Sequence, residues 1–154
     1  MNKAIYAGSF DPFTNGHLDI VKKASKIFDE IHIVIAHNNK KKRTFENIED
    51  MIIAIENTLI AENITNVKVV CYDDLVAKYC KENDIKIIVR GLRNSMDFEY
   101  EENIAKINNL IDPTLETIYF RTNNAAISSS MIKEFLTYHL DVSQYVPKEV
   151  LKIL

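Results

Sequence analysis

The sequence predicts an α/β fold with five parallel strands in one doubly wound sheet, helices on both faces, and a single domain spanning residues 1–154. Two observations lead to this fold. Short apolar runs alternate five times with helical patterns at the spacing of β-α-β units. One run, residues 85–89, is almost entirely β-branched, which is typical of a central parallel strand buried on both faces. No repeat or linker rich in glycine and proline divides the chain.

The N-terminal half is expected to supply three strands, over residues 4–7, 30–36 and 67–71. Each is a short apolar run, and in the second of them isoleucines alternate with His32 and Val34. Apolar residues recur every three or four positions in the segments between and after these strands, which predicts helices. These helices are expected over residues 16–28, 47–60 and 75–82.

The C-terminal half is expected to add strands over residues 85–89 and 117–120 and helices over residues 98–110 and 128–139. Serines open the helix over residues 128–139, and serine is a preferred N-cap residue. A last short helix is expected at Pro147, which suits a first helical turn. Because ligands of such sheets bind at the carboxyl ends of the strands, motifs that follow the strands are expected to share one cleft.

The strongest functional signal lies in residues 5–17. This stretch leaves the first strand at Gly8, turns through Asp11 and enters a helix near His17. The unpaired amides and the dipole at a helix N-terminus favour a bound phosphate, and His17 is aimed at whatever that helix end holds. The alternative interpretation is an ordinary connection with a capping turn.

Other phosphate-binding candidates follow later strands. Arg90 and Arg93 follow the strand over residues 85–89, and an arginine fork grips phosphate in two places. In the basic run at residues 40–43, one lysine is expected to reach the reacting centre while most of the run is solvated. The serines at 128–130 add hydroxyls and a second helix N-terminus. Surface arginines, a solvated loop and a plain serine cap are the structural alternatives.

The acidic string 97–101 either favours a helix N-terminus or supplies a contact to a ribose hydroxyl or a base. Among the other histidines, His32 is expected to be satisfied in the core or exposed, and His139 to pair with a helix dipole. The role of His37 stays open. No cluster of cysteine and histidine predicts zinc, and no Gly-x-Ser-x-Gly motif predicts hydrolysis.

The net charge, the apolar stretches and the cysteines exclude several classes of function. The net charge of −3 gives no electrostatic case for binding nucleic acid. No apolar stretch approaches the roughly 18 residues of a membrane span, so no membrane partner is expected. No signal peptide precedes the first motif, and Cys71 and Cys80 are expected to be reduced thiols in the core. These features predict a cytoplasmic protein.

Residues 14–17, Thr-Asn-Gly-His, resemble the signature of the nucleotidyltransferase superfamily. With residues 8–12, 90–93, 97–101 and 127–130, the chain resembles the phosphopantetheine adenylyltransferase family over nearly its whole length. The resemblance implies a Rossmann-like nucleotidyltransferase domain over residues 1–154. It also implies a transferase of coenzyme A biosynthesis, which reversibly moves the adenylyl group of ATP to 4′-phosphopantetheine and yields dephospho-CoA and pyrophosphate.

The resemblance implies catalytic roles for His17, Lys41 and Arg90, with His17 stabilising the transition state; Lys42 is the alternative to Lys41. The implied phosphopantetheine contacts are Ser9, Lys41, Val76 and Arg90. The implied ATP contacts are Ser9, Phe10, His17, Gly91, Leu92, Arg93, Glu101, Asn124, Ala125, Ala126, Ile127, Ser128, Ser129 and Ser130. Residues 122–126 depart from the family pattern, which leaves the adenine contacts there open.

The resemblance further implies Mg²⁺ bound mainly through ATP, with no metal site of the protein's own, a homohexamer, and feedback binding of coenzyme A. Two sister activities are alternatives. Nicotinate or nicotinamide mononucleotide adenylyltransferases tend to carry arginine where Lys133 stands. Glycerol-phosphate cytidylyltransferases carry an Arg-Thr pair nearer the serine motif than residues 121–122. A non-catalytic nucleotide sensor is a third alternative, and His17 and Arg90 argue against it.

Overall fold

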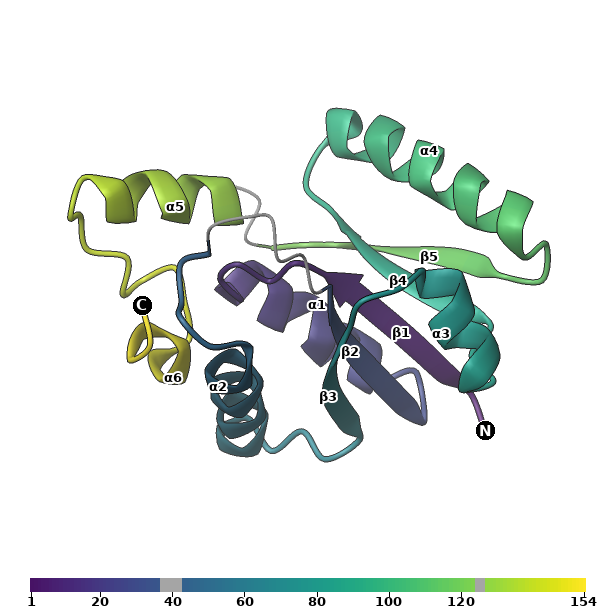
Figure 1. Cartoon of the computed structure of the whole chain (residues 1–154), viewed down its shortest axis with the longest axis horizontal. Coiled ribbons are helices and arrows are strands. Elements are labelled where there is room, and N and C mark those ends of the chain that lie inside the picture. The colour runs from purple at the N-terminus through teal and green to yellow at the C-terminus, as the bar shows by residue number, and fades with distance from the viewer. Residues whose placement is uncertain (37–42, 124–126) are drawn as a thin grey trace.

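A computed structural model describes residues 1–36, 43–123 and 127–154 and arranges five parallel strands in one sheet, in the order β3-β2-β1-β4-β5 (Figure 1). The strands are β1 (Lys3–Gly8), β2 (Glu30–Ala36), β3 (Val67–Tyr72), β4 (Ile87–Leu92) and β5 (Glu116–Arg121). The chain starts in the middle of the sheet, builds outward to β3, and then returns to add β4 on the other side of β1. The reversal of strand order therefore falls between β1 and β4.

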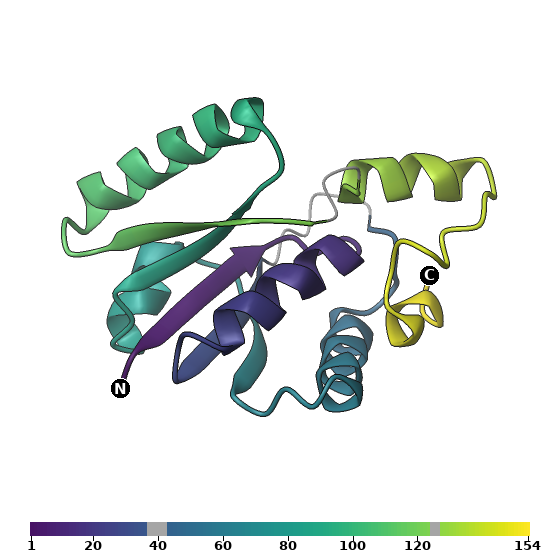
Figure 2. The same ribbon diagram turned by 180° about the vertical axis from the view of Figure 1, so that it is seen from behind.

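The helices are α1 (Asn15–Ser25), α2 (Ile48–Ala61), α3 (Val76–Glu82), α4 (Ser95–Ile111), α5 (Ser129–Thr137) and α6 (Lys148–Leu151). Figures 1 and 2, seen from opposite sides, show α3 in front of the sheet in one view and α1 in front in the other. Alternate residues of β1 enter two separate cores: Ala4 and Tyr6 pack with α1 and α2, and Ile5 and Ala7 pack with α3. The predicted doubly wound sheet is confirmed.

The two central strands separate towards their carboxyl ends. The ladder between β1 and β4 pairs Ala4 with Ile87 and Ile5 with Ile88 and goes no further. The ladder between β4 and β5, in contrast, continues to the end of β4. A crevice therefore opens between β1 and β4 at the reversal of strand order, which is where open α/β sheets bind ligands.

The prediction for β4 was wrong at both ends, since the strand runs over Ile87–Leu92 instead of residues 85–89. Arg90 and Gly91 consequently lie inside the strand and pair with β5. A Cβ atom on Gly91 would lie 3.0 Å from Cγ1 of Ile20, a separation tighter than ordinary packing. Glycine at this position lets α1 approach β4 closely.

Several helix ends also differ from prediction. The first helix ends at Ser25 instead of residue 28. Helix α4 begins three residues earlier than expected, at Ser95, because the side chain of Asn94 accepts a hydrogen bond from the amide of Asp97 and caps the helix. Cys80 is buried as predicted, but Cys71 is exposed. In the part of the chain that the structure describes, every helix is too short or too polar to cross a bilayer.

Candidate active site

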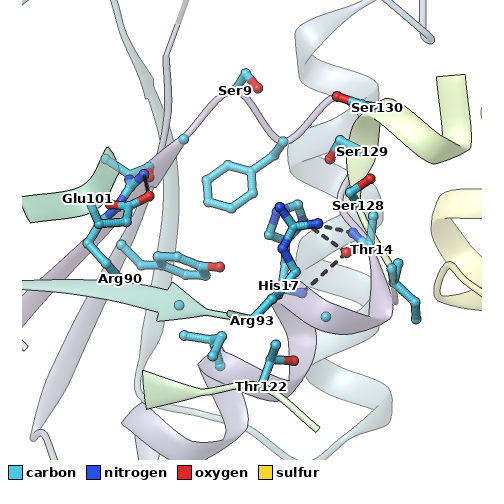
Figure 3. A pocket seen from close by; sticks show the side chains of 18 residues that line it. Ser9, Thr14, His17, Arg90, Arg93, Glu101, Thr122, Ser128, Ser129 and Ser130 are labelled. Carbon is cyan, nitrogen blue, oxygen red and sulfur yellow. Dashed lines mark hydrogen bonds and ion pairs between the residues drawn. The ribbon is translucent and has the colours of Figure 1, made fainter. Parts of the chain in front are cut away.

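A cavity of about 300 Å³ lies at the carboxyl ends of β1 and β4 (Figure 3). Segments far apart in the chain line it: the end of β1 and the turn after it, the start of α1, the end of β4 with part of α4, and the start of α5. The lining includes most of the described residues that the sequence predicted: Ser9, Phe10, His17, Arg90, Gly91, Arg93, Glu101, Ile127, Ser128, Ser129 and Ser130. The motifs that follow the strands therefore do meet at one site.

His17 is held in a defined orientation by the N-cap of α1. The hydroxyl of Thr14 accepts a hydrogen bond from the backbone amide of His17 at 3.3 Å, and Nδ1 of His17 accepts one from the amide of Thr14 at 2.9 Å. A backbone N–H can only donate, so Nδ1 is the acceptor and the ring proton of the neutral imidazole sits on Nε2. The neutral ring is thus anchored through Nδ1, and its Nε2–H stays available as a hydrogen-bond donor.

The surroundings of His17 keep its ring neutral. The ring lies against Phe10 and Phe13, with centroid distances of 4.9 and 5.5 Å. Burial, together with the positive charges of Arg90 and Arg93, lowers the pKa of His17 to about 3. At neutral pH the side chain therefore acts as a neutral hydrogen-bond donor.

This ionisation state predicts a measurable titration. In a proton–carbon NMR titration of the ligand-free protein, the Cε1–H resonance of His17 is expected to stay constant between pH 5 and pH 8, because its pKa lies well below that range. The nitrogen shifts of the ring should be those of the tautomer protonated at Nε2. A titration midpoint near pH 6.5 would contradict the assignment.

Arg90 bridges the gap between the separated strands. Its Nε and Nη2 donate to the two carboxylate oxygens of Glu101 at 2.5 and 2.8 Å, and its Nη1 donates to the carbonyl of Ala7 at 2.7 Å. Burial alone would lower the pKa of Arg90, but the carboxylate of Glu101 outweighs it and raises that pKa. The guanidinium is therefore a charged group fixed at the cavity wall.

Arg93 is positioned in the same way by an acid from α4. Nε and Nη2 of Arg93 donate to the carboxylate of Asp97 at 3.0 and 3.2 Å. Burial opposes ionisation of Asp97, but the hydrogen bonds from Arg93 hold its pKa below the ordinary value. Two acids of the string 97–101, Asp97 and Glu101, are thus engaged in orienting arginines, a role the sequence did not suggest.

Two helix N-termini contribute backbone donors to the cavity. At the start of α1, the amide of Gly16 has no partner among the described residues, whereas that of Asn15 donates to the carbonyl of Tyr145 at 2.9 Å. At the start of α5, the hydroxyl of Ser128 caps the amide of Met131 at 3.1 Å. The cap leaves the amides of residues 129–130 without partners in the described chain. Both helix ends favour an anion at the cavity.

A buried carboxylate joins the cavity turn to neighbouring segments. Asp11, only 4% exposed, accepts two hydrogen bonds of 2.7 Å at Oδ1, from the amide and the hydroxyl of Thr44. Its Oδ2 lies 2.9 Å from Nζ of Lys133 on α5. Burial would raise the pKa of Asp11, but these partners outweigh it and lower that pKa. Ser129 adds a second tie by donating to the carbonyl of Pro12 at 3.0 Å.

Replacing Asp11 with asparagine is expected to lower the free energy of unfolding at pH 7 by about 1–3 kcal/mol, because a buried acceptor of charge-assisted bonds is lost. A carboxyl with a depressed pKa stabilises the fold above its unfolded pKa and loses that effect on acidification. The difference from wild type should thus be full at pH 7 and shrink as the pH falls through the lowered pKa. Urea unfolding of both proteins at several pH values measures this difference in stability. A difference that grows as the pH falls would contradict the prediction.

Comparisons with known proteins identify the family. Residues 5–135 match the model of the cytidylyltransferase-like family. The phosphopantetheine adenylyltransferase of Shouchella clausii is 43% identical over 155 residues, which cover 97% of this chain and 94% of that protein. The protein of the same name from Nautilia profundicola is 41% identical, with 99% and 98% of the two chains covered. The chain belongs to the phosphopantetheine adenylyltransferase family.

The fold is also that of a solved structure. A crystal structure provisionally named nicotinate-nucleotide adenylyltransferase, from Vibrio parahaemolyticus, has a TM-score of 0.71 and covers 100% of this chain and 92% of its own. Its sequence identity to the present chain is 18%, so the likeness concerns the fold alone. It agrees with the Rossmann-like architecture that the sequence predicted.

Some residues implied by the resemblance to phosphopantetheine adenylyltransferases lie elsewhere. Val76, at the start of α3, and Leu92, at the end of β4, are not among the residues that line the cavity. The implied site residues Lys41, Asn124, Ala125 and Ala126 fall outside the residues that the structure describes. So do His37, whose role was left open, and Lys42, the alternative to Lys41.

Other cavity residues were not predicted from the phosphopantetheine adenylyltransferase motifs. Tyr6 lies in β1 two residues before Gly8, and Thr122 directly follows β5. Both occupy the carboxyl-terminal part of a strand or the position just after it. The rule that ligands of α/β sheets bind at these strand ends covers both positions, although it does not distinguish Tyr6 from the other residues of β1.

Proposed function

We propose that this protein transfers the adenylyl group of ATP reversibly to 4′-phosphopantetheine, giving dephospho-CoA and pyrophosphate. One observation carries the proposal beyond family membership: a neutral histidine donor, two fixed guanidinium groups and two helix N-termini converge on a single cavity. Such a set of donors suits a pair of phosphorylated substrates, whose negative charges repel each other and must be brought into contact.

In the proposed reaction, a phosphate oxygen of phosphopantetheine attacks the α-phosphorus of ATP in line. The new bond joins that oxygen to the α-phosphorus, and the bond from the α-phosphorus to the bridging oxygen breaks, so that its electron pair leaves with pyrophosphate. The attacking phosphate is already ionised at pH 7, so the enzyme needs no general base. Catalysis then consists of positioning and of stabilising the charge on the phosphoryl oxygens.

Each predicted residue has a place in this scheme. Nε2–H of His17 donates to an oxygen of the α-phosphate, and Arg93 and the amides at the start of α5 hold the other phosphates of ATP. Ser9 contacts both substrates. Arg90 and Lys41 bind the phosphate of phosphopantetheine. The remaining proposed contacts are Val76 for the acceptor and, for ATP, Phe10, Gly91, Leu92, Glu101 and Asn124 to Ser130.

Mg²⁺ enters the proposed reaction as part of the ATP complex, not as a resident ion of the protein. Glu101, the carboxylate that lines the cavity among the described residues, has both oxygens bound to Arg90, and Asp11 is engaged by Thr44 and Lys133. Both carboxylates already have cationic partners, which supports an ion held through ATP instead. The phosphate oxygens of ATP are then the ligands of the ion.

A pyrophosphate-release assay tests the function. ATP and CTP are each offered with 4′-phosphopantetheine, nicotinamide mononucleotide or glycerol 3-phosphate. Release only with ATP and phosphopantetheine is expected. Turnover with either of the other acceptors would replace the proposal by one of the sister activities. Binding of ATP without turnover of any acceptor would favour a nucleotide sensor.

We also propose that the protein is a cytoplasmic homohexamer and that coenzyme A binds it as a feedback inhibitor. The surface of α4 supports assembly, because large apolar side chains stay exposed along this helix. They are Met96, Phe98, Tyr100, Ile107, Leu110 and Ile111. Sedimentation equilibrium tests the assembly, and competition by coenzyme A against phosphopantetheine in the release assay tests the feedback.

A further inference from the structure

Tyr6 is a cavity residue that the proposed reaction leaves without a role. It lies in β1 on the face that packs against α1, and only 6% of its surface is exposed. Its ring packs edge-on against two other rings. The ring of Phe10 lies at a centroid distance of 5.2 Å with an interplanar angle of 79°, and the ring of His17 lies at 6.2 Å with an angle of 62°. Yet Tyr6 is part of the cavity lining.

The hydroxyl of Tyr6 has no hydrogen-bond partner among the described residues. Buried phenols normally find one, as Tyr79 does, whose hydroxyl lies 2.7 Å from Nδ1 of His32. Of the described side-chain polar atoms that are fully shut off from solvent, Nε2 of His32 is the one that lacks a hydrogen bond. The unbonded hydroxyl of Tyr6 therefore keeps contact with solvent, and for this buried side chain that solvent lies in the cavity.

The charged and amide groups that line the same cavity are mostly donors. Arg90 and Arg93 offer guanidinium N–H groups, His17 offers Nε2–H, and the helix N-termini offer amides. Glu101 is an acceptor, but Arg90 occupies both of its oxygens. The partner missing from this part of the site is thus an acceptor with several oxygens, and a phosphate group has that chemistry.

We propose that the hydroxyl of Tyr6 donates a hydrogen bond to a non-bridging phosphate oxygen of bound ATP. The assignment rests on the proposed adenylyl transfer and adds a substrate contact to it. Burial raises the pKa of the phenol, Arg90 opposes that effect and Glu101 adds to it, so the hydroxyl keeps its proton at neutral pH.

Tyr6→Phe removes the hydroxyl oxygen alone. Since a hydrogen bond to a charged group is lost, kcat/KM for ATP is expected to fall about 10- to 100-fold, and calorimetric titration with MgATP should show weaker binding. The urea midpoint of unfolding should equal or exceed that of wild type, because the hydroxyl has no protein partner.

Tyr79→Phe is the matched control, since it removes an equally buried hydroxyl that does have a protein partner. It should lower the urea midpoint and leave kcat/KM within about twofold of wild type. A Tyr6→Phe variant with unchanged kcat/KM and unchanged MgATP affinity overturns the inference. So does one whose loss of activity comes with a lowered urea midpoint.

If the proposed function is wrong, the assays give a different result from the one expected if only the role of Tyr6 is wrong. If wild type binds MgATP but releases no pyrophosphate with phosphopantetheine, the acceptor is wrong, and the loss of MgATP affinity in Tyr6→Phe still decides the assignment of the hydroxyl. A wild-type protein that does not bind MgATP overturns both.

Discussion

His17→Ala is expected to lower kcat by about 10²- to 10³-fold while the protein stays folded. The imidazole is a preorganised donor: the cap of α1 fixes the ring through Nδ1 and leaves Nε2–H for the proposed bond to the α-phosphate. Alanine removes that donor and opens the site to water. Pyrophosphate release at saturating ATP and phosphopantetheine measures the effect, and urea unfolding reports the fold.

His139→Asn is a suitable control, because His139 is exposed and has a positive φ of 57°, a conformation that asparagine tolerates. Its kcat should match that of wild type. If His17→Ala retains kcat within a few-fold of wild type, the imidazole has no part in stabilising the transition state.

The second large effect concerns the ion pair of Arg90 and Glu101. Glu101→Leu is expected to lower the free energy of unfolding by about 3 kcal/mol, because it strands a charge whose side chain is only 23% exposed. Arg90→Met should cost a similar amount by stranding Glu101. The double variant should recover most of the stability, since apolar side chains can replace a buried ion pair. Its kcat/KM, however, should stay at least about 100-fold below wild type, because the cation is gone.

This double-variant cycle separates two roles of Arg90. Recovery of both stability and activity would show that the guanidinium only closes the gap between β1 and β4. Lys78→Met is the control for the stability arm: its ion pair with Asp74, at 2.7 Å, has side chains 55% and 42% exposed. The stability of this variant should stay close to that of wild type, because an exposed ion pair contributes little.

Sequence patterns predicted the order and kind of the elements but misjudged β4. The β-branched run over residues 85–89 marks a segment buried on both faces, and burial is what such a pattern reports. The strand itself is defined by hydrogen bonds to β5, which continue through Arg90 and Gly91 to Leu92. The side chain of a polar residue at a strand end can line a cavity while its backbone still pairs with the neighbouring strand. The residue types alone therefore do not show where the strand ends.

The site was predictable as far as it follows motifs at strand ends. The partners of its charged groups were not. Asp11 meets Thr44 and Lys133 across 33 and 122 positions of the chain, and only the tertiary packing of the segment before α2 and of α5 against the first turn brings them together. Tyr6 falls in an apolar strand where nothing in the pattern sets its hydroxyl apart. Such pairings depend on tertiary structure and leave no local signal.

The hydrogen bond from Asn15 to the carbonyl of Tyr145 has a consequence for biosynthesis. His17, Arg90 and Arg93 precede the serines at 128–130 and Tyr145 in the chain, so they leave the ribosome before these residues do. A nascent polypeptide therefore completes the cavity of the candidate active site only after residue 145 has been synthesised. Until then, a ligand of this cavity has no finished site to bind, and the earlier segments must fold without stabilisation by it.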